Sequence, residues 1–532
     1  MQAVKKSVSD LIIYQIYVKS FLDTNGDGVG DLQGVIDKLD YLQALGINAI
    51  WLTPCYPSPN YDNGYDVSNY TDIADVYGGM PTWERLVDNL HSRGMLLIMD
   101  LVANHTSIRH PWFEDARKSK DSPYHGYYYF YDTPPNKWRS VFGGSAWEYN
   151  AQTGEYYLHS FAKEQADLNW ENPSVRQEIK RVVDFWVKKG VDGFRCDVLD
   201  YTAKDFAKGL MFGGEKLPSY IQELFDGYGH IFTVGECQST EKNITEFCGK
   251  QTGKLTCIFQ FDHLKIGRKD KWKRLPCTAE QVKKRLCFWQ EFCQQNSLYY
   301  ALFTDNHDYG WFVSVCGNEK SLRFESATMY AAMFYLLKGI PFVYQGQEIG
   351  LVNSTFKSIR AFQDVETKNY YQANVKKLDN AALFARLNFG SRDNPRRPMA
   401  WTDDKSTAYG FSSAKPWLGV SSNGKRINVE RDRKQGEKSV QAFYTALFAL
   451  RKRYKCFTLG AFVDVGKGRG YFMFERTWQT EKFLIVCNFE KPREIALQRQ
   501  GRQGRLVLKN YADRIGFERR FRPYEVAVFQ LD

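Results

Sequence analysis

Short apolar stretches alternate with amphipathic ones along most of this chain, and this alternation constrains the fold more than any other feature. For example, INAIWLTP (47–54) is typical of a buried strand, MPTWERLVDNLHSRG (80–94) of a helix, and MLLIMDLV (95–102) of the next strand. Strand candidates occur at 11–18, 47–54, 95–102, 191–199, 231–237, 254–261, 298–308 and 340–350. Eight β/α units are what a TIM barrel requires, so we expect an α/β protein built on a (β/α)8 barrel.

Two regions interrupt this alternation. Residues 106–171 contain no strand–helix unit, are rich in Tyr, Gly, Trp and Pro, and include the hairpin-like EYNAQTGEYYLHS. After a predicted helix at 440–454, short β-strands such as GYFMFERTW and KFLIVCNFE follow. We therefore predict a barrel from 1–105 and 172–454, an inserted β-rich domain at 106–171, and a C-terminal antiparallel β-sandwich at 455–532.

Composition limits the compartment and the partners. No apolar stretch reaches the roughly 18 residues of a membrane helix. LIIYQIYV has only eight residues and no small-residue cleavage signature after it, so it is typical of a strand and not of a signal peptide. The eleven cysteines form no CxxC pair, and their odd number suits free thiols in a reducing cytoplasm better than a disulfide framework. We therefore expect a cytoplasmic monomer that has no membrane partner.

The net charge is +11, and much of the surplus lies between Arg493 and Arg522. A nucleic-acid surface would give such a charge, but no recognition motif accompanies it, so we expect no nucleic-acid partner. A solvated basic face and a preference for a phosphorylated substrate both remain open.

Carboxylates occur where the predicted strands end. In a TIM barrel these ends form one rim, which holds the active site. One such Asp could be structural, but four strand ends that supply carboxylates beside an Arg and two His are hard to explain as structure. The residues are Asp100, Asn104, His105, Arg195, Asp197, Glu236, His307 and Asp308.

Glycoside hydrolysis requires such a set. It needs a carboxylate nucleophile on one face of the sugar and a protonated carboxylic acid over the leaving oxygen. We expect Arg195 to keep Asp197 ionised as the nucleophile. Glu236 follows the apolar run IFTV, where burial favours the protonated form that a general acid needs.

Four ordered segments carry a family resemblance. DLVANH (100–105), GFRCD (193–197), VGE (234–236) and FTDNHD (303–308) resemble the signature regions of family 13 glycoside hydrolases, the α-amylase family. Further segments resemble the oligo-1,6-glucosidase branch: DNGYD (62–66), GGSAWEYNAQTGEYYLHSF (143–161), QADLN (165–169), QGQEIG (345–350) and RDNPRRPMAW (392–401). The resemblance therefore extends nearly from end to end.

The resemblance implies roles for individual residues. Asp197 matches the nucleophile, Glu236 the acid/base, and Asp308 the carboxylate that grips the 2- and 3-hydroxyls of the sugar. Other matching positions line a closed pocket for the terminal glucose: Asp62, Tyr65, His105, Phe161, Arg195, Val198, His307 and Arg392, with Arg396 as a weaker candidate. A closed pocket implies cleavage from the non-reducing end. We expect the reaction to need no organic cofactor.

The residue after the nucleophile is a clue to the linkage. In this branch a Val there accompanies α-1,6 linkages, so Val198 implies a retaining exo-α-glucosidase for short isomaltose-type sugars, although Val could also stand there as a good strand residue. The chain departs from the branch after Asp308, where Tyr309, Gly310 and Trp311 follow. Trp311 could stack on the leaving sugar or pack the loop.

Other activities remain as alternatives. GECQST (235–240) resembles trehalose-6-phosphate hydrolases, and sucrose-active glucosidases and sucrose isomerases use the same catalytic groups. Non-catalytic family members serve as transporter subunits. Such a subunit would have lost the carboxylates and gained a membrane helix, and neither feature is seen in this sequence.

DTNGDGVGDLQG (23–34) predicts a metal loop. Oxygen donors alternate along it as in the first nine positions of an EF-hand loop, although Gly34 replaces the final Glu. The expected ligands of a structural Ca²⁺ or Mg²⁺ are Asp23, Asn25, Asp27, the carbonyl of Val29, and Asp31. A metal-free Asp/Gly turn is the alternative.

Overall fold

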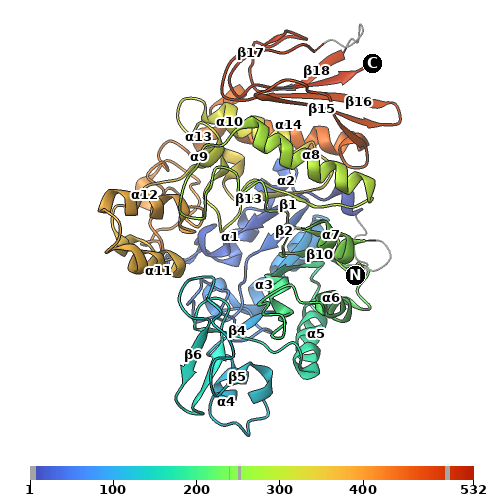
Figure 1. Ribbon diagram of the computed structural model, residues 1–532. Helices are drawn as coiled ribbons and strands as arrows, with labels where there is room; N and C mark the ends of the chain where they lie inside the picture. The colour runs from blue at the N-terminus through green and yellow to red at the C-terminus, as the bar shows by residue number, and fades with distance from the viewer. Residues whose placement is uncertain (1–6, 239, 250–252, 498–503) are drawn as a thin grey trace.

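A barrel of parallel strands forms the centre of the protein (Figure 1). The computed structural model describes residues 7–238, 240–249, 253–497 and 504–532. Part of the N-terminus (1–6), Ser239 of GECQST and residues 498–503 of the basic region lie outside the described residues. The barrel strands are β1 (Ile13–Ile16), β2 (Ala49–Leu52), β3 (Leu96–Val102), β9 (Gly193–Asp197), β10 (Phe232–Gly235), β11 (Cys257–Ile258), β12 (Ala301–Leu302) and β13 (Ile340–Tyr344).

These strands follow the order β11-β10-β9-β3-β2-β1-β13-β12. A parallel bridge between Phe259, just after β11, and Ala301 of β12 joins the two ends of the sheet, so the barrel is nearly closed. All residues of β1, β2, β3, β9, β10 and β13 are buried, as expected for a parallel sheet that is covered on its outer face and packed inside. The eight predicted strands are therefore confirmed.

Helices follow the barrel strands and cover them (Figure 1). They are α1 (Leu32–Asp37), α2 (Leu39–Leu45), α3 (Gly79–Ser92), α5 (Pro173–Lys188), α6 (Leu217–Phe225), α7 (Glu241–Cys248), α8 (Ala279–Gln295), α10 (Arg323–Tyr335) and α14 (Val440–Arg453). Each faces the barrel with apolar side chains, as Val175, Ile179 and Val183 do in α5. The predicted TIM barrel is confirmed.

Five short strands lie between β3 and α5 in the described residues, at the bottom of Figure 1. A three-stranded sheet has the order β5-β7-β6, and β4 pairs with β8. The elements are β4 (His105–Ser107), α4 (Pro111–Ala116), β5 (Phe130–Tyr131), β6 (Trp147–Asn150), β7 (Glu155–Leu158) and β8 (Gln165–Asp167). This is the β-rich insertion expected after the third strand, and its boundaries at 106 and 171 remain a prediction.

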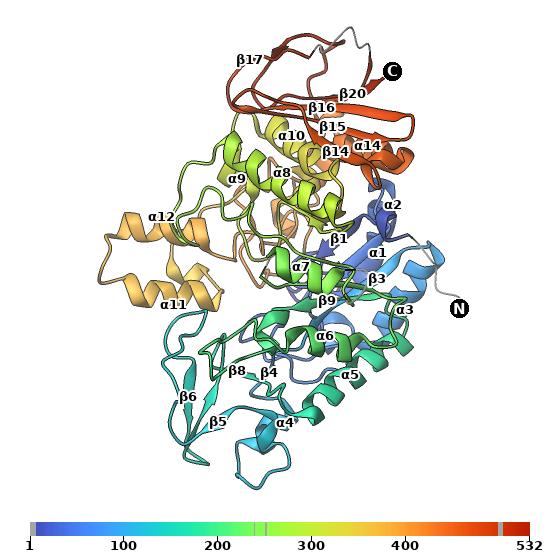
Figure 2. The ribbon, with the colours of Figure 1, turned by 45° about the vertical axis from the view of Figure 1, so that its right-hand side comes forward.

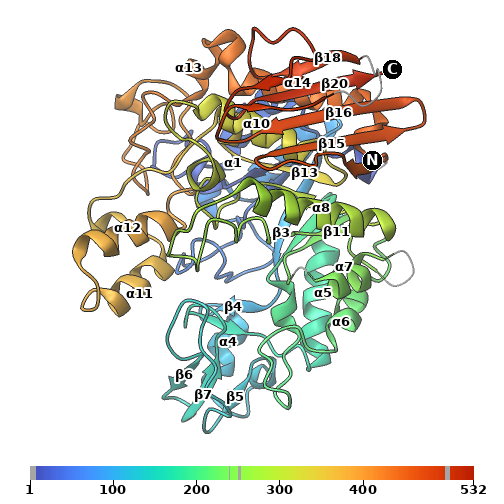
Figure 3. The same cartoon turned by 45° about the horizontal axis from the view of Figure 1, so that its top comes forward.

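The C-terminal strands form an antiparallel sheet in the order β14-β15-β16-β20-β18, clearest in Figure 3. A two-stranded sheet of β17 and β19 covers one face of it, and residues such as Phe472 and Phe474 on the other face join the barrel core. The second layer of the expected sandwich is therefore small. The strands are β14 (Ala461–Asp464), β15 (Tyr471–Trp478), β16 (Glu481–Asn488), β17 (Arg493–Glu494), β18 (Gly504–Lys509), β19 (Arg520–Phe521) and β20 (Val526–Leu531).

Two helices outside the barrel, α11 (Val365–Asn374) and α12 (Asn380–Gly390), were not predicted. They project from the barrel beside the inserted strands (Figure 2). Asn369 Nδ2 of α11 donates to the carbonyl of Phe142 at 3.1 Å, which links this helix to the insertion. The segment between β13 and α14 therefore contributes to the same end of the barrel as the insertion.

The cysteines only partly follow the sequence prediction. Cys277 and Cys316 form a disulfide, so the expectation of free thiols is wrong for this pair, whose partners the spacing alone could not indicate. Nine other cysteines in the described residues are free, most of them buried. None of the helices in the described part of the chain is long and apolar enough to cross a membrane.

Candidate active site

The strand ends place four carboxyl groups at one end of the barrel. Asp100 lies within β3, Asp197 is the last residue of β9, and Glu236 follows the last residue of β10. Asp308 lies in the loop between β12 and α9 (Phe312–Cys316). Because the strands are parallel and pair in register, with Asp100 opposite Arg195, these groups meet at the carboxyl rim.

Arg195 connects three of these carboxyl groups. Its Nη1 donates to Asp100 Oδ1 at 2.8 Å and to Asp197 Oδ1 at 2.7 Å. Its Nη2 donates to Glu236 Oε2 at 2.5 Å. The Arg195 side chain is 2% exposed and that of Glu236 is 19% exposed, so Glu236 lies on the open side of this cluster. Asp197 and Glu236 thus flank a single guanidinium group.

Burial shifts the pKa values of the carboxyl groups in this cluster. It raises the pKa of Asp197 well above its usual range, and the charges of Glu236 and Asp100 add to the effect against that of Arg195. The same burial raises the pKa of Asp100 to about 6. One guanidinium group faces three carboxyl groups, so the pKa of Asp197 shifts in the direction opposite to the one expected from Arg195 alone.

Asp308 has a different environment. Arg396 Nη2 lies 2.9 Å from its Oδ1, and Arg392 Nη1 lies 3.8 Å from the same oxygen. Burial acts to raise the pKa of Asp308, but the positive charges of Arg396 and Arg392 outweigh it and hold this pKa below its usual range. Asp308 is therefore ionised, and Arg396, the weaker candidate from the sequence, is its direct partner.

His307 and Tyr65 form one wall of the site. Their rings stack at 5.3 Å with an interplanar angle of 5°, and Tyr65 Oη lies 2.7 Å from His307 Nε2. Gln15 Nε2 lies 2.8 Å from His307 Nδ1 on the other side of the ring. Burial lowers the pKa of His307 to about 3, so its imidazole is neutral. Gln15 had no sequence signal, because its side chain simply points inward from β1.

An ion pair closes the floor of the site. Arg392 Nη2 lies 2.7 Å from Asp62 Oδ1 and 2.7 Å from Asp364 Oδ1. His105 lies beside this pair, its Nε2 3.0 Å from Gln165 Nε2. All of these side chains are buried. The floor is therefore closed, as the sequence resemblance implied.

Val198 has a backbone conformation that is rare for a β-branched residue. Its φ of 36° and ψ of 46° are left-handed, so it lies beyond the end of β9. Its N–H donates to Glu236 Oε2 at 3.2 Å, and its side chain packs with Phe142 and Phe161. Strand propensity therefore does not explain this Val, and the strained turn that holds it also holds Glu236.

A cavity of about 160 Å³ lies between these groups. Clefts for drug-sized ligands measure roughly 300–1,000 Å³, so this one suits a single sugar ring. Its walls include every predicted catalytic and substrate-binding residue except Arg195 and the weaker candidate Arg396. The lining is Asp62, Tyr65, His105, Val141, Phe142, Phe161, Gln165, Asp197, Val198, Glu236, Lys271, His307, Asp308, Tyr309, Glu366 and Arg392.

Several of these lining residues were not found from the sequence. Lys271 and Glu366 form an ion pair, although they come from the loop after β11 and from α11. Trp311 does not reach the cavity: it is 3% exposed and its ring packs 5.6 Å from that of Tyr344. The structure therefore favours the packing explanation for Trp311, and Tyr309 lines the cavity in its place.

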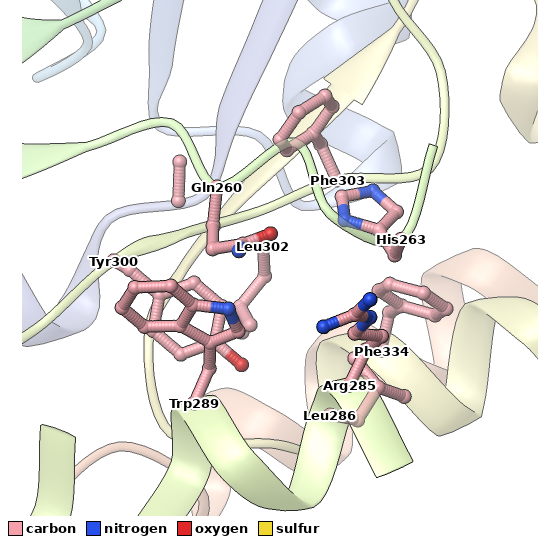
Figure 4. A pocket seen from close by; sticks show the side chains of 10 residues that line it. Gln260, His263, Arg285, Leu286, Trp289, Tyr300, Leu302, Phe303 and Phe334 are labelled. Carbon is pink, nitrogen blue, oxygen red and sulfur yellow. The ribbon is translucent and has the colours of Figure 1, made fainter. Parts of the chain in front are cut away.

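A second, much smaller cavity lies between β11, β12 and α8 (Figure 4). Its volume is only about 10 Å³, which is near the minimum for one water molecule. Gln260 Nε2 and His263 Nε2 at its wall have no hydrogen-bond partner among the described residues. It can therefore hold one water molecule but not a sugar.

The predicted metal loop forms a tight turn. Asp23 accepts the N–H groups of Gly26 and Gly28 at 2.7 and 2.8 Å, and Asp31 accepts that of Gly34 at 2.7 Å. Among the described residues, no group of three or more His, Cys, Asp or Glu side chains is placed to hold a metal ion. The ion therefore remains a prediction from the sequence.

A barrel that carries Asp197, Glu236 and Asp308 at its carboxyl rim beside a closed, sugar-sized pocket defines a glycoside hydrolase. A family model described as alpha amylase, catalytic domain, matches residues 15–460. The chain belongs to this α-amylase family. Its relatives within the family include enzymes of several activities.

Three similar proteins illustrate this range. The oligo-1,6-glucosidase of Halalkalibacterium halodurans is 39% identical over 97% of this chain and 98% of its own length. The trehalose-6-phosphate hydrolase of Escherichia coli K12 is 40% identical over 94% of each chain. The crystal structure of an isomaltulose synthase variant from Erwinia rhapontici NX5 with sucrose has a TM-score of 0.93 at 34% identity, and covers 98% of this chain and 99% of that one.

Proposed function

We propose that this protein is a retaining exo-α-glucosidase that releases terminal glucose from short α-1,6-linked sugars. The observation that carries the proposal is the position of Asp197 and Glu236 on the two terminal nitrogens of one guanidinium group. This arrangement keeps the two carboxyl groups close together. A retaining pair requires a separation of about 5–5.5 Å, whereas an inverting pair must leave room for a water molecule.

The proposed mechanism uses groups already present in the cavity. Asp197 attacks the anomeric carbon while Glu236 gives its proton to the leaving oxygen, and a covalent glucosyl-enzyme forms. Glu236 then removes a proton from the incoming water, which releases glucose with retained configuration.

Exo-action follows from the closed floor. The Asp62–Arg392 pair ends the cavity and presents charged hydrogen-bonding groups to the terminal sugar. A chain cannot extend beyond this point, so cleavage occurs at the non-reducing end, one glucose at a time. Asp308, held ionised by Arg396 and Arg392, would bind two sugar hydroxyls.

Support for the α-1,6 linkage comes from Val198 and from relatives with oligo-1,6-glucosidase names. The left-handed turn aims the Val198 side chain into the cavity next to Glu236, where it can reject leaving groups of the wrong shape. The trehalose-6-phosphate alternative needs a cation for the phosphate. Lys271 lines the cavity, but Glu366 already pairs with it, which favours a neutral sugar.

Further parts of this proposal rest on the sequence. We keep a cytoplasmic location and a monomeric state as proposals; the nine free cysteines in the described residues support the location, whereas the Cys277–Cys316 disulfide counts against it. A structural Ca²⁺ or Mg²⁺ held by residues 23–31 completes the proposal. Such an ion would stabilise the loop after β1 and take no part in bond cleavage.

The test compares glucose release from isomaltose, maltose, sucrose and trehalose-6-phosphate at equal concentrations. Fast isomaltose cleavage with slow maltose cleavage is the expected result. A preference for trehalose-6-phosphate or sucrose would replace the proposed substrate while retaining the mechanism. Inactivity on all four sugars would contradict the proposed function.

A further inference from the structure

The loop after Asp308 is a rigid turn. Asn306 Oδ1 accepts the N–H groups of Asp308 and Tyr309 at 2.9 and 3.0 Å. Asn353 Oδ1 accepts the N–H of Trp311 at 3.0 Å and would lie only 2.9 Å from a Cβ at Gly310. Only glycine fits there without displacing Asn353. With Trp311 buried at the far end, the turn fixes the position of Tyr309.

The Tyr309 ring is supported by residues that do not line the cavity. The Arg268 guanidinium lies 5.3 Å from the ring centroid and also 4.5 Å from that of Phe389. The Phe261 ring lies 6.3 Å from Tyr309. Arg268 is itself held by the carbonyl of Lys271, which accepts from Nη1 at 3.2 Å. A ring supported in this way presents a preorganised surface to the cavity.

Tyr309 lies on the side where the leaving group must be. Its side chain is half-buried and lines the same cavity as Glu236 and Asp308. Glu236 must contact the leaving oxygen to protonate it. The floor at Asp62 and Arg392 is fully buried, whereas Glu236 lies on the open side.

We infer that Tyr309 is a specificity-determining residue whose ring packs against the leaving sugar. This inference rests on the proposed function, and it assigns to Tyr309 the stacking role that the sequence offered to Trp311. The apolar face of a sugar ring gains contact area from a fixed aromatic ring, and that contact exists only while a leaving sugar is present.

The test separates the leaving group from the glucose. Tyr309→Ala is assayed on isomaltose and on α-glucosyl fluoride, whose fluoride leaving group is too small to reach the ring. We expect kcat/KM on isomaltose to fall about tenfold, and kcat/KM on the fluoride to stay unchanged. Tyr309→Phe keeps the ring and should retain the wild-type ratio of the two substrates.

Tyr149→Ala is the matched control, because Tyr149 is 55% exposed on β6 and does not line the cavity. Equal losses on both substrates in Tyr309→Ala, or no loss on isomaltose, would overturn the assignment of Tyr309. Wild-type protein that cleaves neither substrate would overturn the proposed function itself. Wild-type protein that cleaves the fluoride but not isomaltose would overturn the α-1,6 linkage, and the Tyr309 comparison is then made on the glucoside that it does cleave.

Discussion

Asp197 is the residue on which the chemistry depends most directly. Replacing it with Asn keeps its size and one acceptor for Arg195 Nη1 but removes the nucleophile. We expect Asp197→Asn to lose at least about 10³ in kcat, because the covalent route is closed, with an unchanged melting temperature. Steady-state rates and thermal unfolding measure the two quantities. A variant that retains activity would exclude Asp197 as the nucleophile.

For single residues, the chemical type of the side chain allowed a prediction from the sequence. Residues whose role depends only on their position in the folded structure could not be predicted. Asp197, Glu236 and Asp308 were predictable because several strand ends supply carboxylates beside an Arg and two His, a combination that structure alone hardly explains. Gln15 and Glu366 were not predictable, since an inward-facing strand residue and a helix residue distant in sequence carry no local signal. The upward shift in the pKa of Asp197 was not predictable, because burial and the shared use of Arg195 are properties of the assembled cluster.

Among the larger elements, the disulfide connects two loops that wall the cavity. Cys277 ends the loop that carries Lys271, and Cys316 ends α9, which follows the loop of Asp308 and Tyr309. The cysteines are 39 residues apart, for which loop closure contributes roughly 2–4 kcal/mol. We expect a reductant to lower the melting temperature of wild-type protein by several degrees.

Cys277→Ser should show that lower melting temperature without reductant and should not respond further to it. Cys287→Ser, at a free and partly exposed cysteine of α8, is the matched control and should behave as wild type. Identical melting temperatures for oxidised and reduced wild-type protein would mean that the bridge contributes nothing to stability.

The proposed metal ion can be tested in the loop between β1 and α1. Asp23, Asp27 and Asp31 place three negative charges within nine residues, and an EF-hand-type loop completes its oxygen set with an amide and a carbonyl, here Asn25 and Val29. We expect a chelator to lower the melting temperature and excess Ca²⁺ to restore it, because an ion that binds only the folded state stabilises it. Asp27→Asn should weaken this response. A melting temperature independent of chelator would support the metal-free turn.

For the whole molecule, the barrel was predictable because its strands repeat at regular intervals and its helices keep a clear apolar face. The pair α11 and α12 was not, because these helices pack around a small core of their own, which includes Phe362 and Leu387, rather than on the barrel. The contact of α11 with the insertion near Phe142 was equally hidden, since nothing local in either segment specifies it. Sequence periodicity therefore predicted the barrel, whereas the contact between α11 and the insertion at the entrance of the site is visible only in the folded structure.

Buried carboxyls make the stability of the whole protein depend on pH, and Glu348 allows a clear test. Burial raises the pKa of Glu348 to about 7 from an ordinary 4.5, although the hydroxyls of Tyr41 and Tyr14 donate to its Oε1 at 2.7 and 2.9 Å. Because the folded state binds this proton more tightly than the unfolded state, the contribution is complete below pH 4.5 and is lost as pH rises through 7. The shift corresponds to about 3 kcal/mol.

We therefore expect the melting temperature to fall as pH rises from 5 to 8.5, and Glu348→Gln to reduce this fall, because an amide keeps the shape of the protonated acid and cannot ionise. Glu430→Gln, at an exposed glutamate of α13 (Val429–Arg433) paired with Lys434, is the matched control and should keep the wild-type slope. Equal slopes of melting temperature against pH in wild type and Glu348→Gln would show that Glu348 does not titrate in this range. Other buried carboxyls such as Asp200 would then set the pH dependence.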